Sequence, residues 1–148
     1  MVDIIITHTE LSFLFKLVLS VLAGFVIGIE RESRGKDAGI STHTLVILGS
    51  MLFTYMSLIV EDSHNARIAA QIVTGIGFLG AGLILKEGTT VHNLTTAASL
   101  WFAAAIGMAF GFGYYVIGFF STLIAVAILR IPRIGKHIDS EYHIDEKI

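Results

Sequence analysis

The sequence predicts an all-α integral membrane protein built as a bundle of five transmembrane helices. Of its 148 residues, 54% are hydrophobic and 15% are charged, whereas soluble domains average roughly 45–50% and about 25%. The mean hydropathy is +0.78. Between Arg67 and Gly113, two apolar stretches dense in Gly and Ala flank one short polar break. In a bilayer, such small residues let helix backbones approach closely, because packing replaces the hydrophobic effect as the force between helices.

Five apolar segments are long enough to cross the hydrocarbon core, which needs about 20 residues. The last two form one continuous run, which we divide at Gly111–Gly113 because glycine weakens a helix. Pro132 ends the fifth segment. We therefore expect a transmembrane domain over residues 1–131 and a short polar cytoplasmic tail over residues 132–148. The predicted spans are 11–29, 42–60, 68–85, 94–112 and 114–131.

The positively charged residues indicate the orientation. Eight of the ten Lys and Arg residues fall in the first connection, the third connection and the tail. By the positive-inside rule, these segments lie in the cytoplasm, so we expect the N-terminus outside and the C-terminus inside. Met1–Glu10 contains no Lys or Arg, so we expect no cleavable signal peptide. The eight residues are Arg31, Arg34, Lys36, Lys86, Arg130, Arg133, Lys136 and Lys147.

The composition argues against several classes of function. The net charge of −2 provides no basic surface for nucleic acid, and the absence of Cys removes thiolate metal sites. Gly75–Gly80 matches the dinucleotide fingerprint GxGxxG, but it lies inside an apolar span with no acidic residue about 20 positions on. His43, the only His within a span, has no nucleophile or carboxylate at activating spacing. We expect neither an enzyme nor a bound cofactor, and the lipid bilayer is the first partner.

Small residues recur at helical spacing on three spans. We expect them to pack helices together within one subunit, with packing between copies of the chain as the alternative. The third span carries small residues on two faces, so we expect it to lie between two neighbours. The predicted packing glycines are Gly24 and Gly28 on the first span, Gly75, Gly77, Gly80 and Gly82 on the third, and Gly107 and Gly111 on the fourth.

Glu30 lies at the inner end of the first span, beside Arg31 and Arg34. Two interpretations remain open. The segment is a solvated anchor, or Glu30 faces a polar cavity, where it pairs with an arginine or binds a hydrated cation. Glu30 is the single candidate metal ligand. The predicted topology places Thr42, His43, Asn93, Thr95 and Thr96 at the same surface, either as helix caps or as a joint polar vestibule.

Two features lie near the outer surface. Arg67 and Gln71 are four residues apart, and therefore share one helical face. The Gln71 amide lies inside the apolar segment and needs a partner within the protein. Lys16 is expected to snorkel outward towards acidic residues, namely Asp3, Glu10 or Glu61.

Three segments together carry a family resemblance: GIERESRGKDAGISTHTLVILGSMLF, RIAAQIVTGIGFLGAGLIL and LTTAASLWFAAAIGMAFG. They resemble the MgtC/SapB family of bacterial inner-membrane proteins in order and spacing. Ser41 and Asn93 depart from the family pattern, and the chain ends shortly after the fifth span, so the soluble C-terminal domain of longer members is not expected. The family-type residues are Glu30, Arg31, Gly35, Gly39, Thr42, Arg67, Gln71, Gly75, Gly77, Phe78, Gly80, Gly82, Thr95, Thr96, Ala97 and Trp101.

The resemblance implies a multi-pass inner-membrane protein in Mg²⁺ homeostasis, with Mg²⁺ as substrate or ligand and transport as the usual description. It also implies an alternative, a regulator that binds another membrane protein such as the F-type ATP synthase. The residues of the spans bear differently on these two hypotheses. No Asp or Glu lies near the centre of any span, and five thin helices would need a dimer to enclose an ion path. A regulator would instead dock through exposed stripes containing Gly24 or Gly107.

Overall fold

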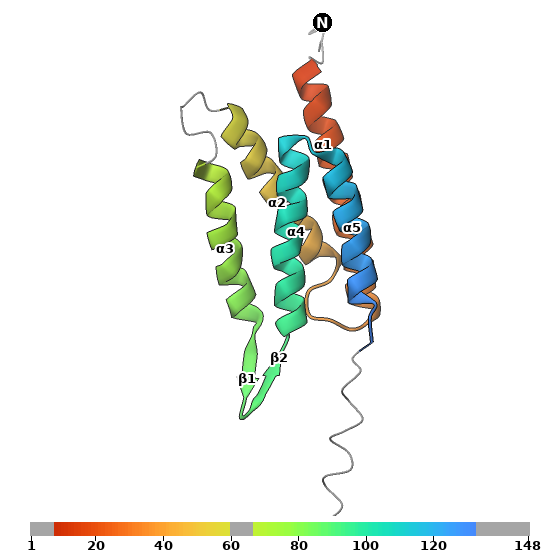
Figure 1. The fold of residues 1–148 in the computed structure, drawn as a ribbon, viewed down its shortest axis with the longest axis vertical. Coiled ribbons are helices and arrows are strands. Elements are labelled where there is room, and N and C mark those ends of the chain that lie inside the picture. Colours follow the sequence, from red (N-terminus) through yellow and green to blue (C-terminus); the bar gives the residue numbers. More distant parts are fainter. Residues whose placement is uncertain (1–7, 60–66, 133–148) are drawn as a thin grey trace, which may run out of the picture.

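The computed structural model describes residues 8–59 and 67–132, which form a bundle of five helices (Figure 1). The predicted fold class is confirmed. The predicted tail beyond Pro132, and the end of the second span at Val60, lie outside the described residues. The elements are α1 (His8–Ser33), α2 (Ile40–Ile59), α3 (Arg67–Leu83), β1 (Leu85–Glu87), β2 (Thr90–His92), α4 (Leu94–Phe112) and α5 (Tyr115–Leu129).

Three of the helices, α1, α2 and α4, are long and apolar enough to cross a membrane. The other two, α3 and α5, are shorter apolar helices that run alongside them (Figure 1). Side chains that face outward from the bundle are large and hydrophobic over much of its surface, for example Phe78, which is 83% exposed. An exposed apolar surface of this extent is stable in lipid and not in water, so the chain is a membrane protein.

The helices α2 and α4 form the centre of the bundle. Both contact α3 on one side, whereas α1 and α5 pack together on the other side (Figure 1). The larger apolar core lies between α1, α2, α4 and α5, around Ile27, Ile47, Met51, Ile106 and Phe110. A smaller core, which includes Ile76 and Leu100, joins α3 to α4.

Glycines set the distance between the central helices. A Cβ atom on Gly24 or Gly28 of α1 would overlap the backbone of α2 at Thr44 or Ile40. A Cβ atom on Gly107 of α4 would likewise overlap the carbonyl of Ile47 on α2. Gly111 of α4 sits in the same way against Met51 and Thr54. The helix α2 is therefore in backbone contact with two neighbours, as small residues at membrane helix interfaces allow.

The glycines of α3 behave differently, which corrects part of the sequence prediction. Only Gly80 packs within the chain, with its added Cβ 3.8 Å from the Cβ of Ala97. A Cβ atom on Gly75, Gly77 or Gly82 would meet nothing among the described residues. The helix does contact two neighbours, but it does so through Ala69, Ile76 and Gly80. Its remaining glycines lie on two exposed faces at the edge of the bundle: Gly75 and Gly82 on the face that carries Gln71, and Gly77 on the other.

Glycines in the left-handed conformation end two of the helices. Gly113 has φ +86°, and the amides of Gly113 and Tyr114 donate to the carbonyls of Phe110 and Ala109. This pair of bonds is a Schellman motif, and it divides the last apolar run where the sequence predicted. Gly35, with φ +60°, ends α1 through the same motif.

The connection between α3 and α4 contains an antiparallel hairpin that the sequence analysis did not predict. Its two strands, β1 and β2, pair Glu87 with Thr90 across a two-residue turn. Gly88 has φ +59° at the first turn position, where a type II′ turn requires glycine. The strands are only three residues long and fully exposed, so hydrophobic periodicity could not reveal them.

The glycine contacts predict a sharp difference between two leucine substitutions. Gly107→Leu should lower the free energy of unfolding by about 3 kcal/mol, because the side chain would enter space occupied by α2. Gly77→Leu should leave the stability unchanged or slightly raised, since its side chain enters open space and leucine favours the helix. Unfolding of both purified variants in the same detergent measures the difference. Equal stabilities would contradict the packing described above.

Candidate functional site

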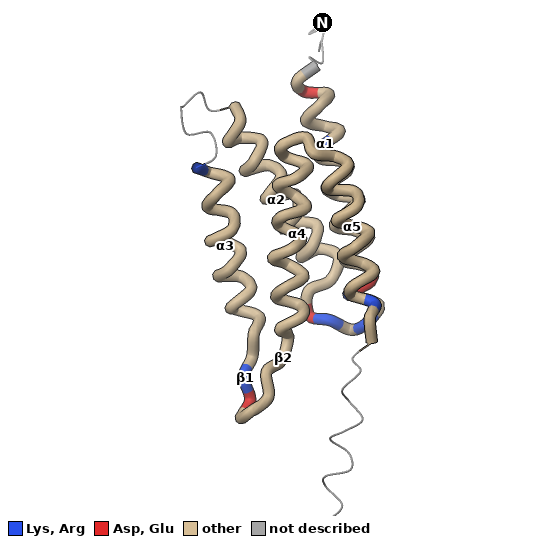
Figure 2. The backbone as a smooth tube through the Cα atoms, viewed as in Figure 1, with Lys and Arg blue, Asp and Glu red and all other residues tan. Residues whose placement is uncertain are grey.

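The charged residues of the described segments gather at the two ends of the bundle (Figure 2). Most of the basic ones lie at the end that contains the α1–α2 loop, the hairpin and the end of α5, which we call the basic end (Figure 2). Its described cations are Arg31, Arg34, Lys36, Lys86 and Arg130. Several buried polar side chains lie at the same end, so it is the candidate functional site.

Glu30 is the centre of a buried charge cluster. Its side chain is 4% exposed and lies between two guanidinium groups, with Oε1 2.7 Å from Nε of Arg34 and Oε2 3.6 Å from Nη1 of Arg31. Neither carboxylate oxygen receives a directional hydrogen bond from the described residues. Charge attraction therefore holds the Glu30 carboxylate in place. The two neighbouring guanidinium charges repel cations, so they disfavour direct coordination of a metal ion by Glu30.

His43, which is also at the basic end, joins α2 to α4. The ring is fully buried, with Nδ1 3.0 Å from the carbonyl of Gly39 and Nε2 3.1 Å from Oγ of Ser99. Because a carbonyl only accepts, Nδ1 carries the proton, and Nε2 of the neutral ring accepts. Ser99 Oγ also lies 2.7 Å from the carbonyl of Thr96, but its single proton can serve only one of these two acceptors at a time. His43 thus links α2 to α4, and the sequence analysis missed its partner Ser99, because the two residues lie 56 positions apart in the chain.

Two further contacts close the basic end. The Asn93 amide donates to the Asp37 carboxylate, which ties the α1–α2 loop to the start of α4. Nη2 of Arg34 donates to the carbonyl of Arg130 over 3.2 Å, which ties the end of α1 to the end of α5. Asn93 occupies the N-cap position of α4 with φ 62°, but its side chain makes no capping hydrogen bond. The cap interpretation is therefore wrong for this side chain.

The other predicted site residues are more dispersed. Thr96 is buried within the site, whereas Thr42 and Thr95 are exposed at its edge. Arg67 and Gln71 are both exposed on α3, and the partner expected for the Gln71 amide is not found among the described residues. Among the described residues, no group of three or more His, Asp or Glu side chains is arranged to hold a metal ion.

The prediction for Lys16 is wrong in direction. The side chain is 7% exposed and turns inward, where Nζ donates to the carbonyl of Gly111 over 2.8 Å and lies 4.9 Å from the centre of the Tyr55 ring. The last carbonyls of a helix carry partial negative charge, so α4 supplies a partner inside the bundle. Asp3 and Glu61, two of the expected partners, lie outside the described residues.

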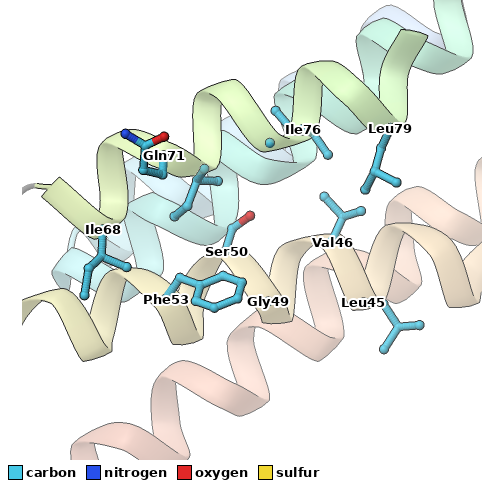
Figure 3. Close-up of a pocket in the computed structure, with 11 residues that line it drawn as sticks. Leu45, Val46, Gly49, Ser50, Phe53, Ile68, Gln71, Ile76 and Leu79 are labelled. Carbon is cyan, nitrogen blue, oxygen red and sulfur yellow. The ribbon is translucent and has the colours of Figure 1, made fainter. Parts of the chain in front are cut away.

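An apolar groove of about 420 Å³ runs between α2 and α3 (Figure 3). Leu45, Val46, Phe53, Ile68 and Leu79 line it, together with Gly49 and Gly75. Gln71 lies at its edge, and among the described residues its amide has no hydrogen-bonding partner (Figure 3). An amide left unpaired in hydrocarbon costs several kcal/mol.

The fold and the site define a class of protein: a small membrane-embedded helical bundle, packed through glycine, with a buried ion-pair layer at one end. Comparison with known sequences identifies the family. The chain belongs to the MgtC family, whose model matches residues 17–136. No solved structure matches the chain.

Three relatives illustrate the similarity. The putative magnesium transporter YhiD of Escherichia coli K12 is 41% identical over 129 residues, which cover 81% of this chain and 60% of the relative. The protein MgtC of Brucella abortus is 47% identical over 113 residues, and that of Salmonella typhimurium is 43% identical over 112 residues. In both cases the match covers 76% of this chain and 48% of the relative. The chain thus spans about half the length of these curated relatives.

The charge cluster predicts that Glu30→Gln destabilises the fold. The substitution removes the carboxylate charge that lies 3.6 Å from the Arg31 guanidinium, which is 3% exposed. Removing one partner of a buried ion pair costs about 3 kcal/mol or more. The double variant Glu30→Gln/Arg31→Gln should recover part of this loss, because it buries no charge at that position. Unfolding midpoints of the three proteins test the cluster, and a Glu30→Gln variant as stable as the parent would contradict it.

Proposed function

We propose that this chain acts in magnesium homeostasis as a multi-pass protein of the bacterial inner membrane, and that it moves Mg²⁺ across the bilayer. The single observation that carries the proposal is its 41% identity to a relative named as a putative magnesium transporter, over 81% of this chain. The proposed orientation places the N-terminus outside and the basic end in the cytoplasm, because basic residues favour that side.

Transport requires more than one copy of the described bundle. Within the described helices the only acidic residues are Glu10, Glu30 and Glu32, and none lies near the centre of a helix. Mg²⁺ gives up its water reluctantly, so an ion path needs polar oxygens around a hydrated ion. We therefore propose a dimer of this chain in which the open α3 face and its unpaired Gln71 amide meet the other copy.

A second candidate function is regulation of another membrane protein without transport. The observation that favours it is the same face, where Gly75 and Gly82 lie on the side of α3 that carries Gln71 and would admit a foreign helix. The docking stripes first expected for this role do not fit, because Gly24 and Gly107 are sealed against α2. The F-type ATP synthase is one partner of this kind to test.

Flux into proteoliposomes separates the two functions. We expect the purified chain to admit Mg²⁺, read by a Mg²⁺ dye inside the vesicles, and Gln71→Leu to abolish the flux. This variant should remain folded, since no described hydrogen bond is lost and the side chain is exposed on α3. Val73→Leu, at another exposed position of α3, is the matched control and should leave the flux unchanged.

Two results would count against transport. Folded parent protein without Mg²⁺ flux would favour the regulator and move the search to its membrane partner. Flux that survives Gln71→Leu would show that the α3 face does not line the ion path.

A further inference from the structure

The basic end contains a second cavity, separate from the buried face of Glu30. It has a volume of about 290 Å³ and lies between the end of α1, the start of α4 and the end of α5. Arg31, Arg34 and Lys36 contribute to one side, and Asn93, Thr95 and Thr96 contribute to a second. The third side is apolar and consists of Ile128, Leu129, Ile131 and Pro132.

The charge on this cavity is one-sided. Three cationic side chains line it, and no acidic side chain of residues 8–59 or 67–132 does. The nearby carboxylates are engaged elsewhere: Glu30 lies beneath two of the cations, Glu32 accepts from the amide of Ile40, and Asp37 accepts from Asn93. Among the described residues, the three cations that line the cavity outnumber the one carboxylate, Glu30, that forms ion pairs with them. Arginines in this arrangement favour an anion with several oxygens, because a guanidinium donates in a fork.

The start of α4 adds neutral donors to the same wall. The first backbone N–H groups of a helix have no intrahelical acceptor, and they carry partial positive charge. In α4 the Asn93 side chain does not cap them, because it is bonded to Asp37. Thr95 and Thr96, which belong to this first turn, face the cavity with Arg31 and Arg34. Guanidinium groups together with a helix N-terminus are the usual elements of a phosphate site.

We propose that this cavity binds a phosphate group, through Arg34, Lys36, Arg31 and the first turn of α4. The cavity is too large for a chloride ion alone, and its apolar side suits the non-polar part of a phosphate ester. It also lies where the charged segment meets the apolar helix, at headgroup depth in either orientation of the bundle. Two sources supply such a group there, an anionic phospholipid of the surrounding leaflet or a soluble phosphate.

The test uses a substitution that should repel a bound anion without destabilising the protein. Thr95→Glu places a carboxylate in the cavity, but a negative charge in the first turn stabilises a helix, so the variant should fold. Thr89→Glu adds the same charge on the exposed hairpin turn at the same end of the molecule and is the matched control. Arg34→Gln/Lys36→Gln is a second variant, with Lys86→Gln on the hairpin as its control.

Two arms of the experiment distinguish the source of phosphate. In the first, each protein is reconstituted in phosphatidylcholine nanodiscs that contain a minority of phosphatidylglycerol, and native mass spectrometry measures the anionic lipid retained. In the second, the nanodiscs contain phosphatidylcholine alone, and inorganic phosphate is compared with chloride at equal ionic strength by its effect on the unfolding temperature.

For a lipid ligand, the parent and both controls should retain phosphatidylglycerol about tenfold better than Thr95→Glu and the double variant. For a soluble ligand, phosphate should raise the unfolding temperature of the parent and the controls, and Thr95→Glu should remove that rise. Either pattern supports the site. It is overturned if the parent and Thr95→Glu behave alike in both arms, or if Thr89→Glu loses as much binding as Thr95→Glu.

Discussion

The backbone of α2 touches α1 and α4 directly, and the rest of the structure depends on these two contacts. Gly24 and Gly28 bring α1 against the backbone of α2, and Gly107 and Gly111 bring α4 against it as well. In lipid no hydrophobic force draws helices together, so van der Waals contact over a close approach must hold them. Any side chain at these positions would separate the helices and remove that contact.

The close approach also allows a polar layer to exist inside an apolar bundle. Ring and hydroxyl groups are short, so His43 on α2 and Ser99 on α4 bond at 3.1 Å only because their helices are nearly in backbone contact. Glu30 and Arg31 are buried in the same region, where a guanidinium and a carboxylate must be paired to be tolerated. The glycines position the helices. The contacts that join separate elements at the basic end are those of His43 with Ser99, Asn93 with Asp37 and Arg34 with the carbonyl of Arg130.

Much of this architecture was predictable from sequence. Hydropathy located all five helices, and the Gly111–Gly113 division between α4 and α5 is confirmed, because glycine in the left-handed conformation ends a helix by a local rule. Helical spacing identified the small residues, but it could not say which stripes face another helix and which face outward. Gly24 and Gly77 look alike in sequence, yet one is sealed by α2 and the other is open.

The candidate site shows the same limit. Sequence placed Glu30, Arg31 and Arg34 together, since they are neighbours on one helix turn. It could not pair Asp37 with Asn93 or Arg34 with the carbonyl of Arg130, because these contacts join residues far apart in the chain. Lys16 shows why. The nearest acidic residues in sequence suggested that its side chain points outward. In the structure it points inward, because the packing of α4 places the carbonyl of Gly111 within hydrogen-bonding distance.

We propose that the α3 face is completed by protein and not by lipid. The chain contains no Cys, so a single nitroxide label can be attached at Phe78 of α3 or at Ile124 of α5, both exposed and near the basic end of their helices. Electron paramagnetic resonance in native membranes then measures collisions of each label with oxygen dissolved in the lipid. We expect a low oxygen accessibility at position 78 and a high one at position 124. Equally high accessibility at both positions would contradict the claim.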